Sequence, residues 1–125
     1  MSIAKTNKSL ISNKRGATLV ETVIVILVLL TLAYGVIEFG LLIRDSLALN
    51  NVAREAARIA AVGGTPDVDT LASQFGLSGS PSATITAPDE PGQQVVVDLT
   101  YTHSMITGLF GADKTLSTTM VMRRE

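Results

Sequence analysis

An early apolar run is the first feature of the hydrophobic pattern. Residues 22–37 carry no charged side chain. A helix over residues 17–37 would be roughly 30 Å long at about 1.5 Å per residue, which is enough to cross a bilayer. Since backbone groups in hydrocarbon must be bonded internally, we expect a helix here despite the many β-branched residues. A buried helix of a soluble domain is the alternative, but the rest of the chain offers little material to surround it.

The helical pattern continues beyond the apolar run. No proline occurs up to Ala61, and the glycines at 63 and 64 are typical of a helix end. We therefore predict one long helix over residues 17–62, transmembrane over about 17–37. Its second half is amphipathic. The apolar side holds Leu42, Leu49, Val52, Ala56 and Ile59, and the polar side holds Asn51, Arg54, Glu55 and Arg58.

A stripe of small residues follows the same half of the helix. Ala53, Ala57 and Ala61 recur at four-residue spacing, which lets another helix or a sheet approach closely. Packing against a helix of another subunit and packing within the chain's own domain are both consistent with this stripe. The polar residues Arg54, Glu55 and Arg58 are best explained as a solvated helix face rather than a docking site.

Residues 63–93 form a predicted loop region rich in Gly, Ser, Pro and Thr. It contains a short helix in "PDVDTLASQFGL", with Asp67 or Asp69 as N-cap and with Val68, Leu71 and Phe75 on one side. Capping explains "DVDT" better than a calcium loop, whose remaining ligands are missing. One short strand is expected at residues 83–86.

Residues 94–125 are predicted to form a small antiparallel β domain. "QVVVDLTYTH" alternates, with Val95, Val97, Leu99 and Tyr101 on one face, and "TLSTTMVM" alternates through Leu116, Thr118, Met120 and Met122. The apolar face of such a sheet needs a cover, which the amphipathic half of the long helix can supply. The expected fold class is α+β, with a long N-terminal helix packed on a small C-terminal antiparallel sheet.

The charge pattern orients the chain. Residues 1–16 hold four basic residues and no acid, whereas six basic and eleven acidic residues follow. A basic flank before an apolar run predicts a single-pass protein of the cytoplasmic membrane with its N-terminus inside and its C-terminal domain outside. The acidic remainder does not indicate a nucleic-acid partner.

No catalytic constellation is evident in the sequence. Cysteine is absent, and His103 has neither a second histidine nor an acidic pair nearby in the sequence. We therefore expect no enzyme activity, no metal and no cofactor.

Glu21 is the unusual residue of the apolar segment, because a carboxylate in hydrocarbon costs several kcal/mol. A basic leader, Gly16 and an apolar helix with an acid five residues after the glycine together resemble a type IV pilin-like precursor. In that family a prepilin peptidase cuts after the glycine. The resemblance implies that residues 1–16 are removed as a leader, that Ala17 becomes the N-terminus and that Glu21 serves subunit assembly. The new ammonium at Ala17 could pair with this acid, within one chain or between neighbours.

The resemblance is closest to the TadE-like family of the tight-adherence system, over residues 15–61. "RGATLVE", "EFG" and "AREAAR" occur together there, and the "VVVDLTY" strand and the "MRRE" terminus are also similar. Major pilins of this system are shorter and usually carry Tyr where Thr22 stands. The resemblance implies a minor pilin or pseudopilin that acts in pilus initiation, assembly or adhesion. Its implied partners are prepilin peptidase, other pilins and pseudopilins, the inner-membrane assembly platform and the lipid bilayer.

Two other functions are open at this point. The chain could be a secreted binding module, cut by signal peptidase after "AYG" at 33–35, or an unprocessed single-span anchor. Two roles are also open for Glu38. Its side chain can pair with a group such as Arg44 of a neighbouring helix, or it can lie in the interfacial region of the membrane.

Overall fold

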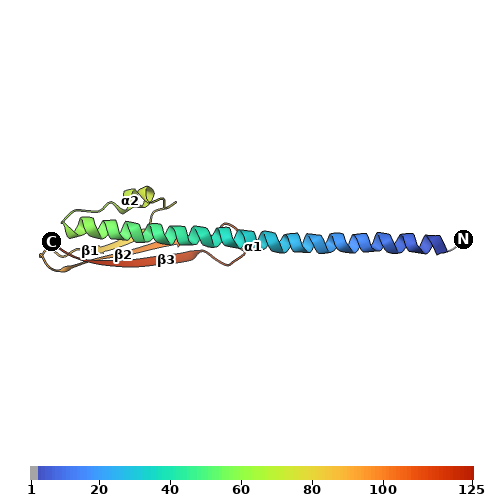
Figure 1. Cartoon of the computed structure of the whole chain (residues 1–125). Helices are drawn as coiled ribbons and strands as arrows, with labels where there is room; N and C mark the ends of the chain where they lie inside the picture. The colour runs from blue at the N-terminus through green and yellow to red at the C-terminus, as the bar shows by residue number, and fades with distance from the viewer. Residues whose placement is uncertain (1–2) are drawn as a thin grey trace. The chain divides into compact units, whose positions relative to one another are not determined.

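The computed structural model describes residues 3–125, with side chains from residue 16 onward. Two compact units are present, residues 1–37 and residues 38–125. The elements are α1 (Ile3–Ala61), α2 (Val68–Gln74), β1 (Ser82–Thr86), β2 (Gln94–His103) and β3 (Lys114–Arg123) (Figure 1). The predicted α+β class, with a long N-terminal helix packed on an antiparallel sheet, is confirmed.

In the first unit, α1 carries its apolar side chains outward. From Leu19 to Ile37 its large hydrophobic residues are 50–75% exposed. A stretch of α1 within residues 16–61 is long and apolar enough to cross a membrane. This helix is compatible with a single-pass membrane protein.

α1 ends where the glycine pair predicts. Gly63 has a φ of 82°, which favours glycine. Its N–H donates to Ala60 O at 3.1 Å, and the N–H of Gly64 donates to Ile59 O at 2.9 Å. A Cβ on Gly64 would lie only 3.0 Å from Ile59 O, so both positions suit glycine.

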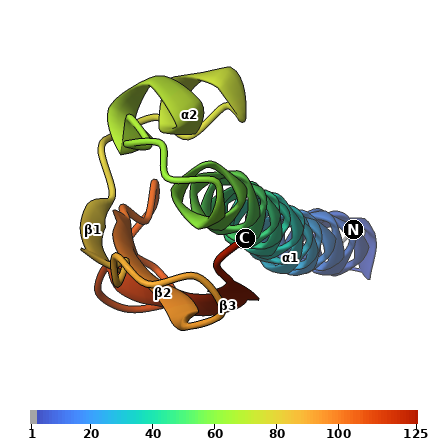
Figure 2. The same ribbon diagram turned by 90° about the vertical axis from the view of Figure 1, so that its left-hand side faces the viewer.

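Within the second unit, the sheet and α2 both lie against the 38–61 part of α1 (Figure 2). The sheet is antiparallel throughout, in the order β1-β2-β3. Ser82 pairs with Thr100, and Val97 pairs with Met120. The short strand expected at residues 83–86 is confirmed as β1, which pairs with β2 in the same sheet.

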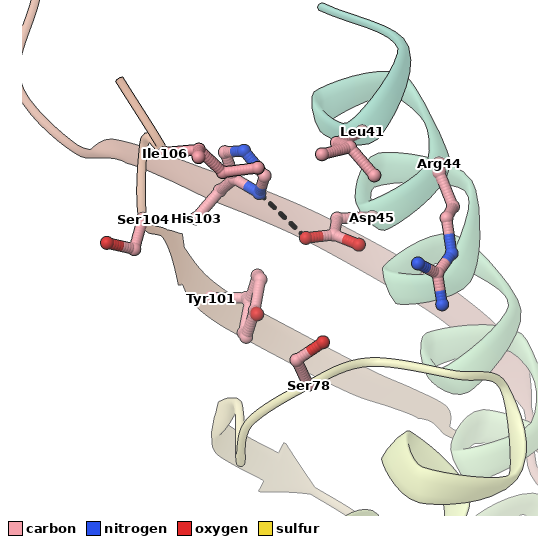
Figure 3. A pocket seen from close by; sticks show the side chains of 8 residues that line it. All are labelled: Leu41, Arg44, Asp45, Ser78, Tyr101, His103, Ser104 and Ile106. Atoms are coloured by element: carbon pink, nitrogen blue, oxygen red, sulfur yellow. Dashed lines mark hydrogen bonds and ion pairs between the residues drawn. The ribbon is translucent and has the colours of Figure 1, made fainter. Parts of the chain in front are cut away.

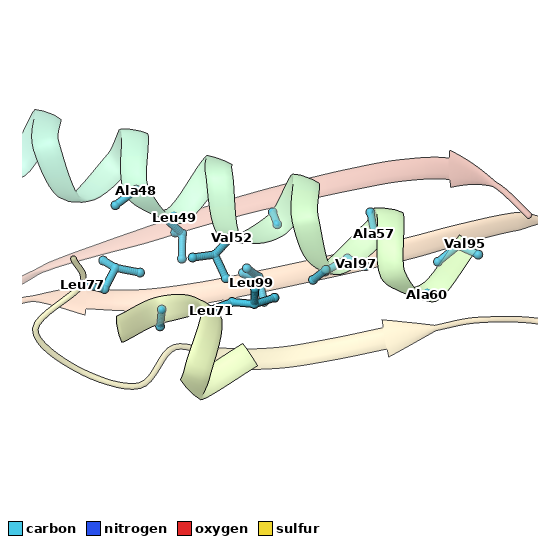
Figure 4. Close-up of a cluster of buried hydrophobic side chains, with 13 residues drawn as sticks. Ala48, Leu49, Val52, Ala57, Ala60, Leu71, Leu77, Val95, Val97 and Leu99 are labelled. Atoms are coloured by element: carbon cyan, nitrogen blue, oxygen red, sulfur yellow. The ribbon is translucent and has the colours of Figure 1, made fainter. Parts of the chain in front are cut away.

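The core of this unit is small and rich in alanine (Figure 4). The alternation predicted for β2 is confirmed, since its apolar face is buried. Leu116, Met120 and Met122 of β3 pack against the cluster from the edge of the sheet. The cluster consists of Ala48, Leu49, Val52, Ala53, Ala56, Ala57, Ala60, Leu71, Ala72, Leu77, Val95, Val97 and Leu99.

α2 begins at the predicted cap, Asp67. Its carboxylate accepts from Thr70 N at 3.2 Å and from Thr70 Oγ1 at 2.7 Å. The hydroxyl bond, followed by the backbone bond, lowers the pKa of Asp67 below its ordinary value. Among the residues expected on one side of this helix, Leu71 is buried, whereas Phe75 is not. Phe75 is the C-cap and is 41% exposed, because Ala72 takes the inner position.

The C-terminus is tied to the body of the unit by backbone hydrogen bonds. Arg124 N donates to Gln93 O at 2.8 Å, and Glu125 N donates to Ala61 O at 3.1 Å. The Arg124 guanidinium also donates to Pro88 O at 2.6 Å. The basic pair in "MRRE" therefore has a structural role in holding the β1–β2 loop.

Candidate functional site

The residues of the predicted processing site lie on α1. Gly16, Ala17 and Glu21 are all exposed. Among the described residues, and leaving aside its chain neighbours and the adjacent helical backbone, no atom lies within 4 Å of a Cβ built on Gly16. Ala17 and Glu21 are four residues apart, so they lie on the same side of the helix, one turn from each other.

Hydroxyl groups of the apolar segment are satisfied within the helix. Thr22 Oγ1 donates to Thr18 O at 2.8 Å, and Thr31 Oγ1 donates to Leu27 O at 2.9 Å. Bonds of this kind remove the cost of placing a hydroxyl in hydrocarbon. Thr22, which stands beside Glu21, is therefore compatible with an apolar surrounding.

Glu38 is the first residue of the second unit and one of its buried polar residues, only 2% exposed. Its Oε1 accepts from Ile106 N at 2.6 Å, and its Oε2 accepts from Thr107 Oγ1 at 3.3 Å. Arg44 donates to Gly76 O at 2.9 Å. The partners of Glu38 are thus groups of the β2–β3 loop of the same chain.

Asp45 of α1 and His103 at the end of β2 form a buried pair (Figure 3). His103 Nδ1 lies 2.7 Å from Asp45 Oδ2, and both side chains are less than 10% exposed. Within the described part of the chain, His103 Nε2 has no hydrogen-bond partner. The sequence shows no acidic residue close to His103, and the fold brings Asp45 to it from 58 positions away.

A cavity of about 190 Å³ adjoins this pair. Leu41, Arg44, Ser78, Tyr101, Ser104 and Ile106 complete its lining. Burial, and after it the charge of Asp45, raises the pKa of Tyr101 above its ordinary value. Among the described residues, no group of three or more His, Cys, Asp or Glu side chains is placed to hold a metal. The arrangement suits a polar link between helix and sheet.

The small-residue stripe lies against the unit's own interior. Ala53 and Ala57 are completely buried in the core cluster, and Ala61 is 6% exposed. Their burial is accounted for by the sheet and α2 of the same chain. The polar side of the helix is exposed at Arg54 and Arg58.

An ion pair lies on this polar side. Arg58 donates two hydrogen bonds to the Glu55 carboxylate. These bonds lower the pKa of Glu55 and raise that of Arg58. Such an exposed pair adds little stability, in keeping with a solvated face.

Comparison with known proteins gives one family match, over part of the chain. Residues 16–58 match the family model described as TadE-like protein. This segment is similar to the TadE-like family. The match covers about a third of the chain and begins at the predicted processing glycine. No curated protein and no solved structure gives a significant match.

The TadE-like segment contains most of the residues discussed above. Gly16, Glu21, Glu38 and Asp45 all fall within it, whereas His103 lies outside.

Proposed function

We propose that this chain is a minor pilin or pseudopilin of a tight-adherence pilus, acting in pilus initiation, assembly or surface adhesion. The observation that carries the proposal is the TadE-like match that starts at Gly16, where a basic leader meets an apolar helix. In this proposal residues 1–16 are a leader, residues 17–37 anchor the chain in the cytoplasmic membrane, and the unit from Glu38 onward lies outside. Prepilin peptidase, other pilins and pseudopilins, and the assembly platform are its partners.

Processing between Gly16 and Ala17 requires local opening of α1, because proteases act on opened backbone. Glycine costs a helix about 1 kcal/mol relative to alanine. Gly16 is therefore a position where the helix opens readily, and its lack of a side chain leaves the backbone accessible to the peptidase.

The matched substitutions Gly16→Ala and Gly40→Ala test this step. Both positions have open space around an added Cβ, so both variants keep the fold. With prepilin peptidase co-expressed, we expect the Gly40→Ala chain to be shortened and the Gly16→Ala chain to keep its leader. Equal shortening of both chains would overturn the proposed processing site.

Glu21 acts in subunit assembly in this proposal. Cleavage creates an ammonium at Ala17, and two opposite charges tolerate hydrocarbon better as a pair than apart. Pairing with the Ala17 ammonium of a neighbouring subunit would set the axial register of the subunits. Pairing within one chain is the simpler arrangement, since the two residues are one helical turn apart.

Glu21→Ala separates assembly from processing. We expect the variant to be cleaved normally, because the peptidase needs the glycine, but to lose co-purification with other pilins. Thr22→Ala, at the adjacent position, is the control and keeps both properties. Normal piliation in the Glu21→Ala strain would contradict the assembly role.

The helix gives no support to secretion by signal peptidase. Residues 33–35 lie well inside α1, which continues without a break to Ala61. Cleavage there would divide a continuous helix and remove residues 16–35 of the segment that matches the family.

A further inference from the structure

The β2–β3 loop, residues 104–113, carries an apolar surface outside the core. Ile106 is 68% exposed, Leu109 is 64% exposed and Phe110 is 39% exposed. Between His103 and Asp113 the sequence has no charged residue. A surface loop normally places polar residues at such positions, so these side chains need an explanation.

The conformation of the loop is fixed by hydrogen bonds at its base and within it. Met105 N donates to Asp113 Oδ1 at 3.2 Å, and Leu109 N donates to Thr107 Oγ1 at 3.4 Å. Gly108 has a φ of 63°, which turns the chain at the tip. The apolar side chains are therefore presented by a preorganised turn.

Glu38 and Phe39 hold the loop beside the helix. The Glu38 carboxyl accepts the N–H of Ile106 at 2.6 Å, and the rings of Phe39 and Phe110 lie 5.9 Å apart in a tilted arrangement. In the sequence, Glu38 directly follows the uncharged run that ends at Ile37. The residue that anchors the loop is thus the one that directly follows the apolar run in the sequence.

We infer that the tip of this loop, Ile106, Leu109 and Phe110, inserts into the interfacial region of the outer leaflet of the bilayer. Aromatic and aliphatic side chains without charges suit this region. The Glu38 carboxyl is satisfied by the loop's own donors, so an acid at the membrane boundary does not face lipid unpaired. The inference rests on the membrane-spanning part of the proposed function.

The size of the surface favours lipid over a protein partner. Three exposed apolar side chains fall well short of the roughly 1,000 Å² that a specific protein interface buries. Insertion into a bilayer does not require a buried area of this size. In the proposed function α1 already attaches the chain to the membrane, and the apolar tip of the loop adds to that attachment.

The chain lacks tryptophan, so single-Trp variants test the inference directly. Leu109→Trp probes the loop and Leu29→Trp probes the apolar helix. Val62→Trp is the control, because Val62 directly follows the last residue of α1 and is 63% exposed. Each full-length variant is reconstituted in phosphatidylcholine vesicles brominated either near the glycerol end or near the methyl end of the acyl chains.

For Leu109→Trp we expect blue-shifted emission. We also expect the lipid brominated near the glycerol end to quench this emission several-fold more strongly than the lipid brominated near the methyl end. Leu29→Trp should be quenched more by the lipid brominated near the methyl end, and Val62→Trp by neither. Quenching of Leu29→Trp with none of Leu109→Trp would overturn the inference and leave the membrane span intact. Absence of quenching at both positions would overturn the span as well. A shift of Leu109→Trp emission that follows the protein-to-lipid ratio, without quenching, would assign the loop to a second copy of the chain.

Discussion

Glu38→Ala should release the β2–β3 loop without unfolding the sheet. The carboxyl of Glu38 is 2% exposed and accepts a 2.6 Å hydrogen bond from Ile106 N. Truncation leaves this amide, and the hydroxyl of Thr107, without their acceptor. The hydrophobic cluster of the unit does not include either residue, so the loss is local.

The size of the effect follows from the cost of an unsatisfied amide. This hydrogen bond is only partly buried, so its loss costs about 0.5–1.5 kcal/mol, which corresponds to roughly a 2-fold to 13-fold increase in the population of the open loop. Amide hydrogen exchange of Ile106, measured on the full chain in detergent micelles, should accelerate by this factor. Glu38→Gln keeps a side-chain oxygen acceptor and should accelerate exchange less.

Glu55→Ala is the matched control, because Glu55 is an acid on the exposed face of the same helix. Its removal breaks the bond to Arg58 and should leave the exchange of Ile106 unchanged. If Ile106 exchanges at the same rate in Glu38→Ala as in the unsubstituted chain, the hydrogen bond does not hold the loop and the reasoning fails.

Three further predictions concern the second unit. In a double-mutant cycle of Asp45→Ala and His103→Ala, urea unfolding should give a coupling free energy of about 1–3 kcal/mol, since the pair is buried at 2.7 Å; additive effects would exclude coupling. Leu49→Ala should lower the free energy of unfolding by about 2–5 kcal/mol because this side chain is 1% exposed, whereas Leu47→Ala, at a residue 60% exposed, should change it by about 0.5 kcal/mol or less. For Asp67, whose pKa is lowered by folding, the stabilisation is present above the unfolded pKa and is lost as the pH falls through the folded pKa. Urea titrations at falling acid pH should therefore show a loss that is smaller in Asp67→Asn, and equal losses in both chains would refute the cap's contribution.

The periodic parts of the fold could be predicted from the sequence because burial follows a local rule there. Val95, Val97 and Leu99 alternate with polar residues, and their burial in β2 follows from the strand period of two. The helix end and the cap at Asp67 also follow from local chemistry. Phe75 is different, since its apolar character predicts burial while its position as C-cap exposes it.

The polar contacts of the second unit could not be predicted, because they join residues distant in the sequence. Asp45 and His103 are 58 positions apart, and Glu38 and Ile106 are 68 apart. The partner of Glu38 is a backbone N–H, which every residue except proline carries, so no residue type in the sequence marks it. Only the packing of α1 beside the end of β2 and the β2–β3 loop brings these groups together.

The most direct test of the proposed function is the intact mass and N-terminal peptide of the protein recovered from membranes, with and without co-expressed prepilin peptidase. We predict that the chain begins at Ala17 only when the peptidase is present and keeps its full length when it is absent. An N-terminus at Val36 would contradict this and indicate a secreted domain. If the leader is retained both with and without the peptidase, the prediction is contradicted as well, and the chain is a permanent membrane anchor.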